Sequence, residues 1–203
     1  FKKIIPCGIK DLKIIKLKEI SNIKLDDFIK ILKKYKFKSL NSTNNTALTY
    51  VKRGYKNGII ISEIQRKGKG QRSKVWISNK GNLFISVFFK INKELKIKNI
   101  INLVLKIIKK IISKNIKEKI TIKKPNDILI KNKKVCGILQ EILYKNKDKY
   151  LIIGIGINII NSPKLLNYPT TYLNRHSTFK INKDKLINQI KINFEKNYKL
   201  FSI

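Results

Sequence analysis

The chain of 203 residues is long enough for one globular domain with a buried core. Hydrophobic residues make up 42% and charged residues 29% of it, a mixture that excludes both a disordered chain and a membrane protein. The Ile-rich stretches are short or interrupted by Lys, so no run reaches the roughly 20 apolar residues of a membrane span. The first residues also lack the apolar core of a secretory signal. We therefore expect a cytoplasmic protein with no membrane partner.

The net charge of +35 by itself predicts binding to nucleic acid or to another anionic surface. Only four of the 47 basic residues are Arg, however, and the chain is also rich in Ile and Asn. Lys, Ile and Asn share A/T-rich codons, so mutational drift explains all three excesses. The lysines are also spread along the chain instead of forming one stripe with interleaved aromatic residues. We expect no specific nucleic-acid partner, with a basic nucleic-acid-binding protein as an alternative function.

The chain offers few residues for metal, redox or acid–base chemistry. Cys7 and Cys136 have no metal-like spacing and no nearby His, so we expect no metal site and no disulfide. The single histidine, His176, sits in a polar stretch. An acid or base needs partners, and we therefore predict an incidental surface residue there.

The N-terminal stretch differs from the rest and is predicted to be an extension over residues 1–37. Apolar residues at helical spacing behind Asp26 and Asp27 predict one short helix over residues 25–35. A winged helix-turn-helix needs about three helices and a hairpin, which this stretch does not supply. One domain is then expected over residues 38–203.

From Phe37 onward the pattern is that of a mixed sheet with helices. Ser42 begins an N-cap signal for a helix over residues 45–52, which Gly54 ends. The expected fold class is α+β, with a mixed, largely antiparallel sheet flanked by helices, and its last four strands form consecutive hairpins. Strands are predicted at residues 58–64, 83–89, 119–122, 128–131, 135–143 and 150–158, and further helices at 97–117 and 183–200.

A glycine-containing basic loop over residues 65–76 connects two predicted strands. Gly68 and Gly70 let the backbone approach a ligand, and the surrounding cations can neutralise phosphate. The loop does not match the P-loop pattern, because no helix follows it. A phosphate clamp and a mobile basic hairpin loop are both open at this point.

A second stretch places a lysine near a carboxylate. Pro125 ends one strand, Asn126 and Asp127 suit a turn, and the chain returns so that Lys134 can lie near Asp127 across a hairpin. A lysine held by a carboxylate stays charged and positioned, as stabilising a pentavalent phosphorus centre requires. Gly137 would let a ligand ring lie against the backbone. In the alternative, Asp127 caps a turn and Lys134 is a solvated lysine.

A third stretch, residues 151–158, alternates Gly154 and Gly156 with Ile. Such alternation leaves one face of a strand almost bare, which makes room for a flat ligand or for another backbone. A buried strand packed closely against a helix would show the same pattern.

In this order the stretches resemble the biotin-protein ligase family, also called biotin-acetyl-CoA-carboxylase ligase, over roughly residues 38–160. The resemblance implies the class II synthetase-like catalytic domain of the biotin and lipoate ligases. The matching pieces are Leu40-Asn41-Ser42-Thr43-Asn44, Gln65 with the Gly68-Lys69-Gly70 loop ending at Trp76, Gly81-Asn82-Leu83, Lys124-Pro125-Asn126-Asp127, Lys134 with Gly137, and Gly154-Ile155-Gly156-Ile157-Asn158.

The resemblance implies a two-step, ATP-dependent reaction. The biotin carboxylate attacks the α-phosphorus of ATP with Mg²⁺ assistance, giving biotinyl-5′-AMP and pyrophosphate, and a lysine of a biotin carboxyl carrier protein is then acylated. Lys134 would bridge the biotin carboxylate and the α-phosphate, and Asp127 would orient Lys134. Implied biotin-binding residues are Ser42, Thr43, Asn44, Gln65, Gly68, Lys69, Gly70, Gln71, Lys134 and Gly137, and implied nucleotide-binding residues are Lys69, Arg72, Trp76, Asn126 and Asn158.

The basic loop departs from the pattern of the family it resembles, Gly-Arg-Gly-Arg-x-Gly-Arg-x-Trp. Lys69, Gln71, Ser73 and Lys74 replace the first Arg, the second Arg, the third Gly and the third Arg. Lys cannot make the bidentate contact that Arg makes to phosphate. A leakier adenylate intermediate is therefore predicted, unless Arg72 takes over the role of the second Arg.

Other departures concern the ends of the chain and the rival reaction. Without a helix-turn-helix we expect no repressor function, and the small C-terminal β-domain of many relatives is expected to be absent or reduced. Lys124 stands where the resembled family has Trp, so one apolar wall contact is missing.

Lipoate-protein ligase is the alternative within the fold, although its Arg-Arg-x-Gly-Gly-Gly loop has no counterpart here. The sequence leaves the oligomeric state open, a homodimer included.

Overall fold

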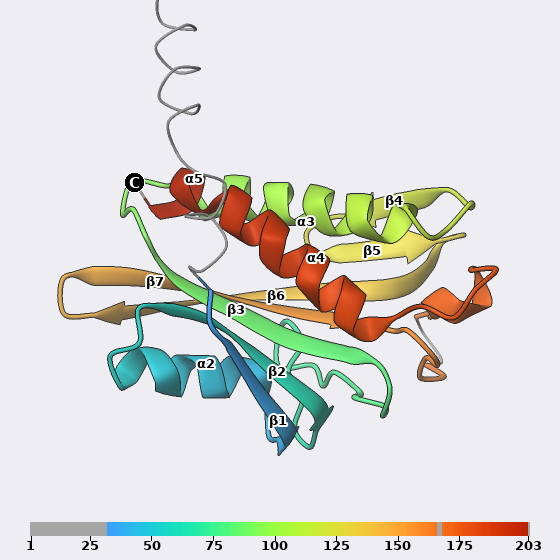
Figure 1. Ribbon diagram of the computed structural model, residues 1–203, viewed down its shortest axis with the longest axis horizontal. Helices are drawn as coiled ribbons and strands as arrows, with labels where there is room; N and C mark the ends of the chain where they lie inside the picture. The colour runs from blue at the N-terminus through green and yellow to red at the C-terminus, as the bar shows by residue number, and fades with distance from the viewer. Residues whose placement is uncertain (1–31, 166–167, 203) are drawn as a thin grey trace, which may run out of the picture.

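A computed structural model describes residues 32–165 and 168–202 and contains one seven-stranded sheet (Figure 1). The strand order is β1-β2-β3-β7-β6-β5-β4. Only β1 and β2 run parallel, and every other neighbouring pair is antiparallel. The predicted mixed, largely antiparallel sheet is confirmed. The strands are β1 (Lys34–Leu40), β2 (Asn57–Gln65), β3 (Leu83–Ile91), β4 (Ile120–Lys123), β5 (Asp127–Ile130), β6 (Lys133–Lys145) and β7 (Asp148–Ile157).

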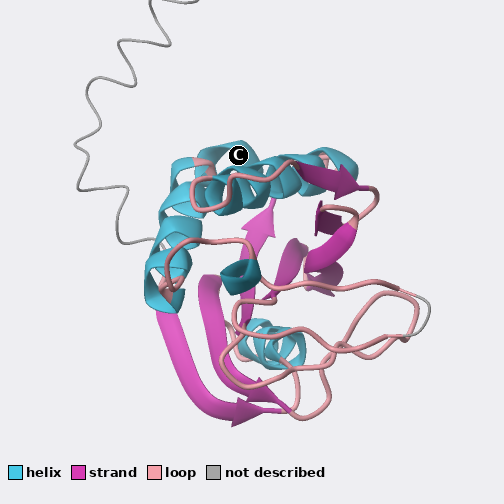
Figure 2. Ribbon diagram, turned by 90° about the vertical axis from the view of Figure 1, so that its right-hand side faces the viewer, coloured by secondary structure: helices cyan, strands magenta, loops and turns pink. Residues whose placement is uncertain are grey.

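Helices cover both faces of this sheet because its strands are apolar on both sides. In β2, for example, Ile59 and Ile61 join the larger core under the helices α3 (Ile97–Ser113) and α4 (Lys183–Lys196). Ile60 joins a smaller core under α2 (Thr43–Lys52). Figure 2 shows α2 on one side of the sheet and the longer helices on the other. The helices are α2 (Thr43–Lys52), α3 (Ile97–Ser113), α4 (Lys183–Lys196) and α5 (Tyr198–Ser202), with a 3₁₀ turn η2 (Leu173–Arg175).

The consecutive hairpins predicted after α3 are confirmed as β4 to β7. The register between β5 and β6 shifts at Ile128 and Leu129, and the Lys131-Asn132 turn has positive φ at both residues, 47° and 60°. Helix α3 is four residues shorter than predicted, because the chain leaves the helix after Ser113 to reach β4. The predicted C-terminal helix is divided at Asn197 into α4 and α5.

The predicted N-terminal helix falls mainly on residues outside the described part of the chain, and its last two residues are not helical. Lys34 and Tyr35 begin β1, where Lys34 faces Ile59 and the Tyr35 ring lies 4.7 Å from that of Tyr50. Pairing with β2 and aromatic packing therefore override the local helical pattern. The predicted boundary between residues 37 and 38 falls inside β1.

No helix among the described residues is long and apolar enough to cross a membrane.

Candidate active site

A cleft brings the three predicted stretches together. It lies where the N-terminus of α2, the basic loop after β2 and the strands β6 and β7 meet. Most of the predicted site residues line it, whereas Gly68, Arg72, Asp127 and Asn158 do not. The lining residues are Ser42, Thr43, Asn44, Gln65, Lys69, Gly70, Gln71, Trp76, Ile85, Asn126, Lys134, Gly137, Ile138, Leu139, Gly154, Ile155 and Gly156.

The start of α2 forms one wall of the cleft and is tied to β2. Ser42 is the N-cap residue and is 2% exposed. The side-chain oxygen of Gln65 accepts hydrogen bonds from the backbone N–H and the hydroxyl of Thr43, at 2.8 and 3.1 Å. The Gln65 amide nitrogen donates to the Ser78 hydroxyl at 3.1 Å. These polar groups are therefore fixed before any ligand enters.

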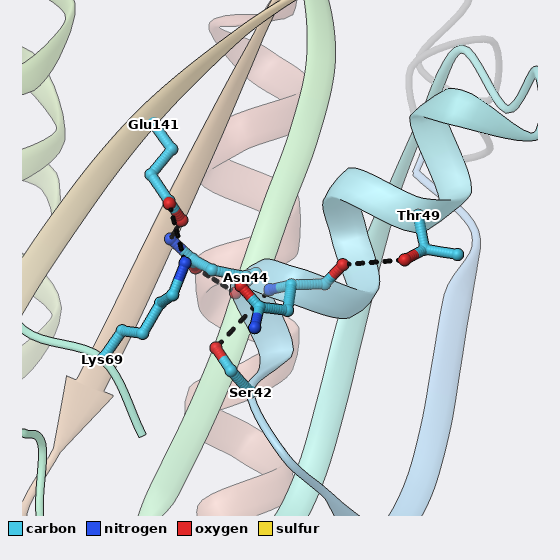
Figure 3. Close-up of polar contacts among 7 residues, drawn as sticks. Ser42, Asn44, Thr49, Lys69 and Glu141 are labelled. Atoms are coloured by element: carbon cyan, nitrogen blue, oxygen red, sulfur yellow. Dashed lines mark hydrogen bonds and ion pairs between the residues drawn. The ribbon is translucent and has the colours of Figure 1, made fainter. Parts of the chain in front are cut away.

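A buried amide at the second residue of α2 connects three elements of the site (Figure 3). The Asn44 amide nitrogen donates to Oε2 of Glu141 at 2.7 Å, and its oxygen accepts from the Ser86 hydroxyl at 2.5 Å. The other oxygen of Glu141 lies 3.2 Å from Nζ of Lys69. Glu141 on β6 thus joins the basic loop to α2, and neither Glu141 nor Ser86 was predicted from the sequence.

The glycines of β6 and β7 make room for side chains of the protein itself. A Cβ at Gly154 would lie 2.3 Å from Oδ1 of Asn44, so this glycine permits the close approach of α2. Gly137 and Gly156 face each other across the strands, and a Cβ on either would lie 2.7 or 2.5 Å from the Trp76 indole. Trp76 and Asn44 occupy the bare face at these positions, which is the close packing that the sequence left open beside a flat ligand.

Trp76 thereby becomes a wall of the cleft. Its backbone N–H donates to the carbonyl of Gly68 at 2.9 Å, which closes the base of the basic loop. Within the loop, Lys69 and Val75 form an antiparallel bridge, and Arg72 and Ser73 at its tip have φ of 52° and 60°. The loop is thus a hairpin whose base lines the cleft, with Arg72 exposed at its tip.

Lys134 and Asp127 form the ion pair that the sequence predicts. The Lys134 Nζ lies 2.7 Å from Oδ1 of Asp127, and the two side chains are only 19% and 12% exposed. Asp127 begins β5 and Lys134 follows the start of β6, so the tight turn between these strands sets the pair. Nζ also lies 5.3 Å from the centre of the Trp76 ring, within the range of a cation–π contact.

Tyr168 completes the surroundings of this ion pair and was not predicted. Its hydroxyl donates to Oδ2 of Asp127 at 2.7 Å, and its ring centre lies 5.4 Å from Nζ of Lys134. Burial, together with the hydrogen bond to Asp127, raises the pKa of the Tyr168 hydroxyl well above its ordinary value. Tyr168 lies 34 positions after Lys134 in a loop, and no local pattern marks it.

Asn158 supports the site from below instead of lining it. It is 2% exposed, and its amide nitrogen donates to the carbonyl of Thr171 at 3.1 Å. Thr171 in turn donates its backbone N–H to the carbonyl of Lys134 at 2.9 Å. Asn158 thus helps to hold the segment that runs beside Lys134, and its nucleotide contact stays a prediction.

His176 is not the surface residue that we predicted. Its side chain is 8% exposed, with Nε2 2.8 Å from the Thr171 hydroxyl and Nδ1 3.0 Å from Oε1 of Glu118. The hydrogen bond to His176 lowers the pKa of the Glu118 carboxyl. Thr171 is 2% exposed, and this chain of hydrogen bonds braces the segment around η2 against Glu118.

Within residues 32–165 and 168–202 no group of three or more His, Cys, Asp or Glu side chains could hold a metal ion. Asp127, the carboxylate nearest the cleft lysine, has both oxygens engaged by Lys134 and Tyr168. Mg²⁺ commonly keeps several waters and binds substrate phosphates with one or two protein carboxylates. The site therefore does not fit a resident metal held by the protein alone.

Comparison with solved structures identifies the fold. The biotin protein ligase from Aquifex aeolicus in complex with biotin and ATP has a TM-score of 0.69 at 24% identity, covering 84% of this chain and 73% of that one. A bipartite lipoate protein ligase from Thermoplasma acidophilum has a TM-score of 0.55 at 10% identity, covering 83% and 84%. The catalytic fold of both classes of ligase is thus the fold of this chain.

Sequence comparison identifies the family. Residues 36–158 match the biotin/lipoate A/B protein ligase family, and the chain belongs to it. The bifunctional ligase/repressor BirA of Bacillus subtilis is 31% identical over 170 residues, 79% of this chain and 52% of the relative. The protein of that name from Escherichia coli is 31% identical over 123 residues, 59% of this chain and 38% of the relative. The chain spans about half the length of these relatives or less.

Proposed function

We propose that this chain is an ATP-dependent biotin-protein ligase. It would form biotinyl-5′-AMP from biotin and ATP and transfer biotin to a lysine of a biotin carboxyl carrier protein. The observation that carries the proposal is the buried Lys134–Asp127 pair at a cleft walled by Trp76, the start of α2 and a basic loop. Membership of the family and the 31% identity to bifunctional ligase/repressor proteins support it.

In the first step a carboxylate oxygen of biotin attacks the α-phosphorus, and the bond from that phosphorus to the bridging oxygen of pyrophosphate breaks. Negative charge on the reacting phosphoryl oxygens is opposed by the Lys134 ammonium group, which Asp127 and two aromatic rings hold in place. Lys69 of the basic loop supplies a second cation to the cleft. Mg²⁺ would enter with the nucleotide, bound to its phosphates and to water, and would neutralise part of their charge.

In the second step the amine of the acceptor lysine attacks the carbonyl of biotinyl-5′-AMP. The new amide bond forms, the acyl–phosphate bond breaks, AMP leaves, and the nitrogen of the neutral amine gives up one proton to solvent while keeping the other as the amide N–H. Trp76 and the glycine-lined strands beneath it would keep water from the mixed anhydride, because they form an apolar wall at the cleft. A cytoplasmic location, where ATP and carrier protein are available, belongs to the same proposal.

The deciding experiment is incubation of the purified chain with ATP, Mg²⁺, biotin and a carboxyl carrier domain, followed by intact mass of the carrier. We expect a mass increase of one biotin, lost when ATP is omitted. An unchanged carrier mass would refute the proposal.

Lipoate ligation is the second candidate, because a lipoate protein ligase shares the fold. Replacing biotin by lipoate and measuring pyrophosphate release separates the two. Pyrophosphate release with lipoate but not with biotin would assign the chain to the lipoate branch of the family.

A further inference from the structure

We propose that Tyr168 is a positioning residue for Lys134, acting through the carboxylate of Asp127. The kinetic consequence of this inference rests on the proposed ligase function. Its structural content, that removal of the Tyr168 hydroxyl frees the Lys134 ammonium group, can be tested without any activity.

Lys134 and Tyr168 divide the carboxylate of Asp127 between them, the first through an ion pair and the second through a hydrogen bond. Lys134 lies 2.7 Å from Oδ1, and the Tyr168 hydroxyl donates to Oδ2 over 2.7 Å. With Lys134 as its only partner, the carboxylate could rotate and offer either oxygen. With both oxygens engaged, rotation would break one contact. The Tyr168 hydroxyl therefore fixes the plane of the carboxylate and, with it, the direction of Nζ.

The backbone keeps Tyr168 in register with Lys134. The Lys134 N–H donates to the carbonyl of Pro169 at 2.9 Å, and the Thr171 N–H donates to the carbonyl of Lys134 at 2.9 Å. Lys134 and Thr170 form a parallel bridge. The segment that carries Tyr168 is thus an extra strand-like edge beside the start of β6, so the ring and the lysine are held by the same hydrogen bonds.

The rings on either side of Nζ complete the arrangement. The ammonium group lies 5.4 Å from the ring centre of Tyr168 and 5.3 Å from that of Trp76. Nζ of Lys123 lies 4.6 Å from the Tyr168 ring as well. Since burial and the neighbouring Asp127 raise the pKa of the Tyr168 hydroxyl, it stays protonated, and remains a donor, at the pH where such an enzyme works.

The kinetic test compares Tyr168→Phe with Tyr172→Phe in the full chain. Both variants lose one tyrosine hydroxyl from the same segment, but only that of Tyr168 bonds to Asp127. We expect Tyr168→Phe to lower kcat for pyrophosphate release about tenfold, roughly the effect of one hydrogen bond to a charged group, with the KM for biotin within twofold. Tyr172→Phe should behave as wild type. Equal kcat values in the two variants would overturn the inference.

A chemical test does not depend on turnover. The full chain is treated with a limiting amount of an amine-acetylating reagent, and peptide masses give the labelling rate of Lys134, with the exposed Lys133 as internal reference. We expect Tyr168→Phe to raise the Lys134 rate several-fold while the Lys133 rate stays constant. An unchanged rate at Lys134 would overturn the inference even if the wild-type chain releases no pyrophosphate. A positive result beside an inactive wild type would instead refute only the proposed function.

A double-variant cycle separates positioning from general destabilisation. In an Asp127→Asn background, which keeps the shape of the side chain, Tyr168→Phe should have no further effect on Lys134 labelling. Additive effects of the two substitutions would show that Tyr168 acts independently of Asp127 and would refute the mechanism. The unfolding midpoints of all variants are measured as well. They identify any variant in which Lys134 is labelled faster merely because the chain is unfolded.

Discussion

The indole ring of Trp76 lies directly on the backbone of Gly156. Even a side chain of one carbon at position 156 would collide with the ring. An added Cβ would lie 2.5 Å from the ring, and across the strand pair the same holds for Gly137 at 2.7 Å. Two glycines on neighbouring strands thus form a flat seat for the only tryptophan of the chain. The seat fixes one wall of the cleft, and the first prediction follows from it.

We expect Gly156→Ala to destabilise the fold by about 1–3 kcal/mol, the usual cost of overpacking, and to push Trp76 off the strands. Chemical denaturation gives the free energy of unfolding, and tryptophan fluorescence reports on Trp76 alone, because no other Trp is present. In a Trp76→Ala background the cost of Gly156→Ala should largely disappear. A cost that persists there would mean that the ring is not what excludes the methyl group.

The second prediction concerns Lys134. Lys134→Ala should reduce pyrophosphate release at least about 100-fold, because it removes the cation placed for the reacting phosphate. The matched control is Lys133→Ala, which deletes the exposed neighbouring lysine of the same strand. Binding to a polyanion such as heparin should weaken equally and slightly in both variants, since each removes one of the 47 basic side chains. A Lys134→Ala variant with wild-type turnover would be incompatible with the proposed mechanism.

The third prediction concerns the ion pair between Lys69 of the basic loop and Glu141 of the strand β6. Glu141→Gln removes the ion pair with Lys69, and it should change stability by less than about 1 kcal/mol, because Lys69 is 41% exposed and water screens the pair. The loop itself should become more accessible, so trypsin should cut it faster after Lys67, Lys69, Arg72 or Lys74. Glu63→Gln, at an exposed position of β2, is the control. Equal cutting rates in both variants would show that the ion pair between Glu141 and Lys69 does not hold the basic loop in place.

The fourth prediction concerns retention of the adenylate. Gln71 lines the cleft and Lys74 does not, whereas the family pattern has Arg at both positions. Under the proposed function, Gln71→Arg should slow the escape of biotinyl-5′-AMP several-fold, because Arg can contact phosphate through two donors. Lys74→Arg should leave escape unchanged. Trapping free adenylate after a single turnover measures both, and tight retention by the wild-type chain would contradict the prediction of a leaky intermediate.

The fifth prediction is a dependence of stability on pH. The hydrogen bond from His176 holds the pKa of Glu118 below its ordinary value of 4.5 in the folded state. The corresponding stabilisation is therefore fully present above pH 4.5 and is lost as the pH falls through the lower, folded-state pKa. Thermal melts of wild type and Glu118→Gln should differ at pH 6 and converge as the pH falls below the folded-state pKa of Glu118. A difference that grows on acidification would reverse the sign and refute this account.

Local sequence patterns were sufficient for most of the fold. The β-branched runs from Gly58 and Leu83 are strands because apolar residues on both faces must be buried between helices. The Lys134–Asp127 pair was also predictable, since the hairpin of β5 and β6 returns the chain so that Lys134 comes near Asp127. Spacing along the chain predicts such a contact because only a few residues join the two strands of a hairpin.

Contacts between distant segments could not be read in this way. The strand β7 lies between β3 and β6, and this placement sets Gly156 opposite Gly137 and under a ring that is 80 positions away. Tyr168 and Glu141 acquire their partners only when the loop before η2 and the basic loop fold back onto β6. The sequence by itself determined the sheet apart from β1, together with its hairpins and the central ion pair. Tertiary structure alone decided what surrounds that pair, because long-range packing is set by the summed burial of the whole core and not by any local pattern.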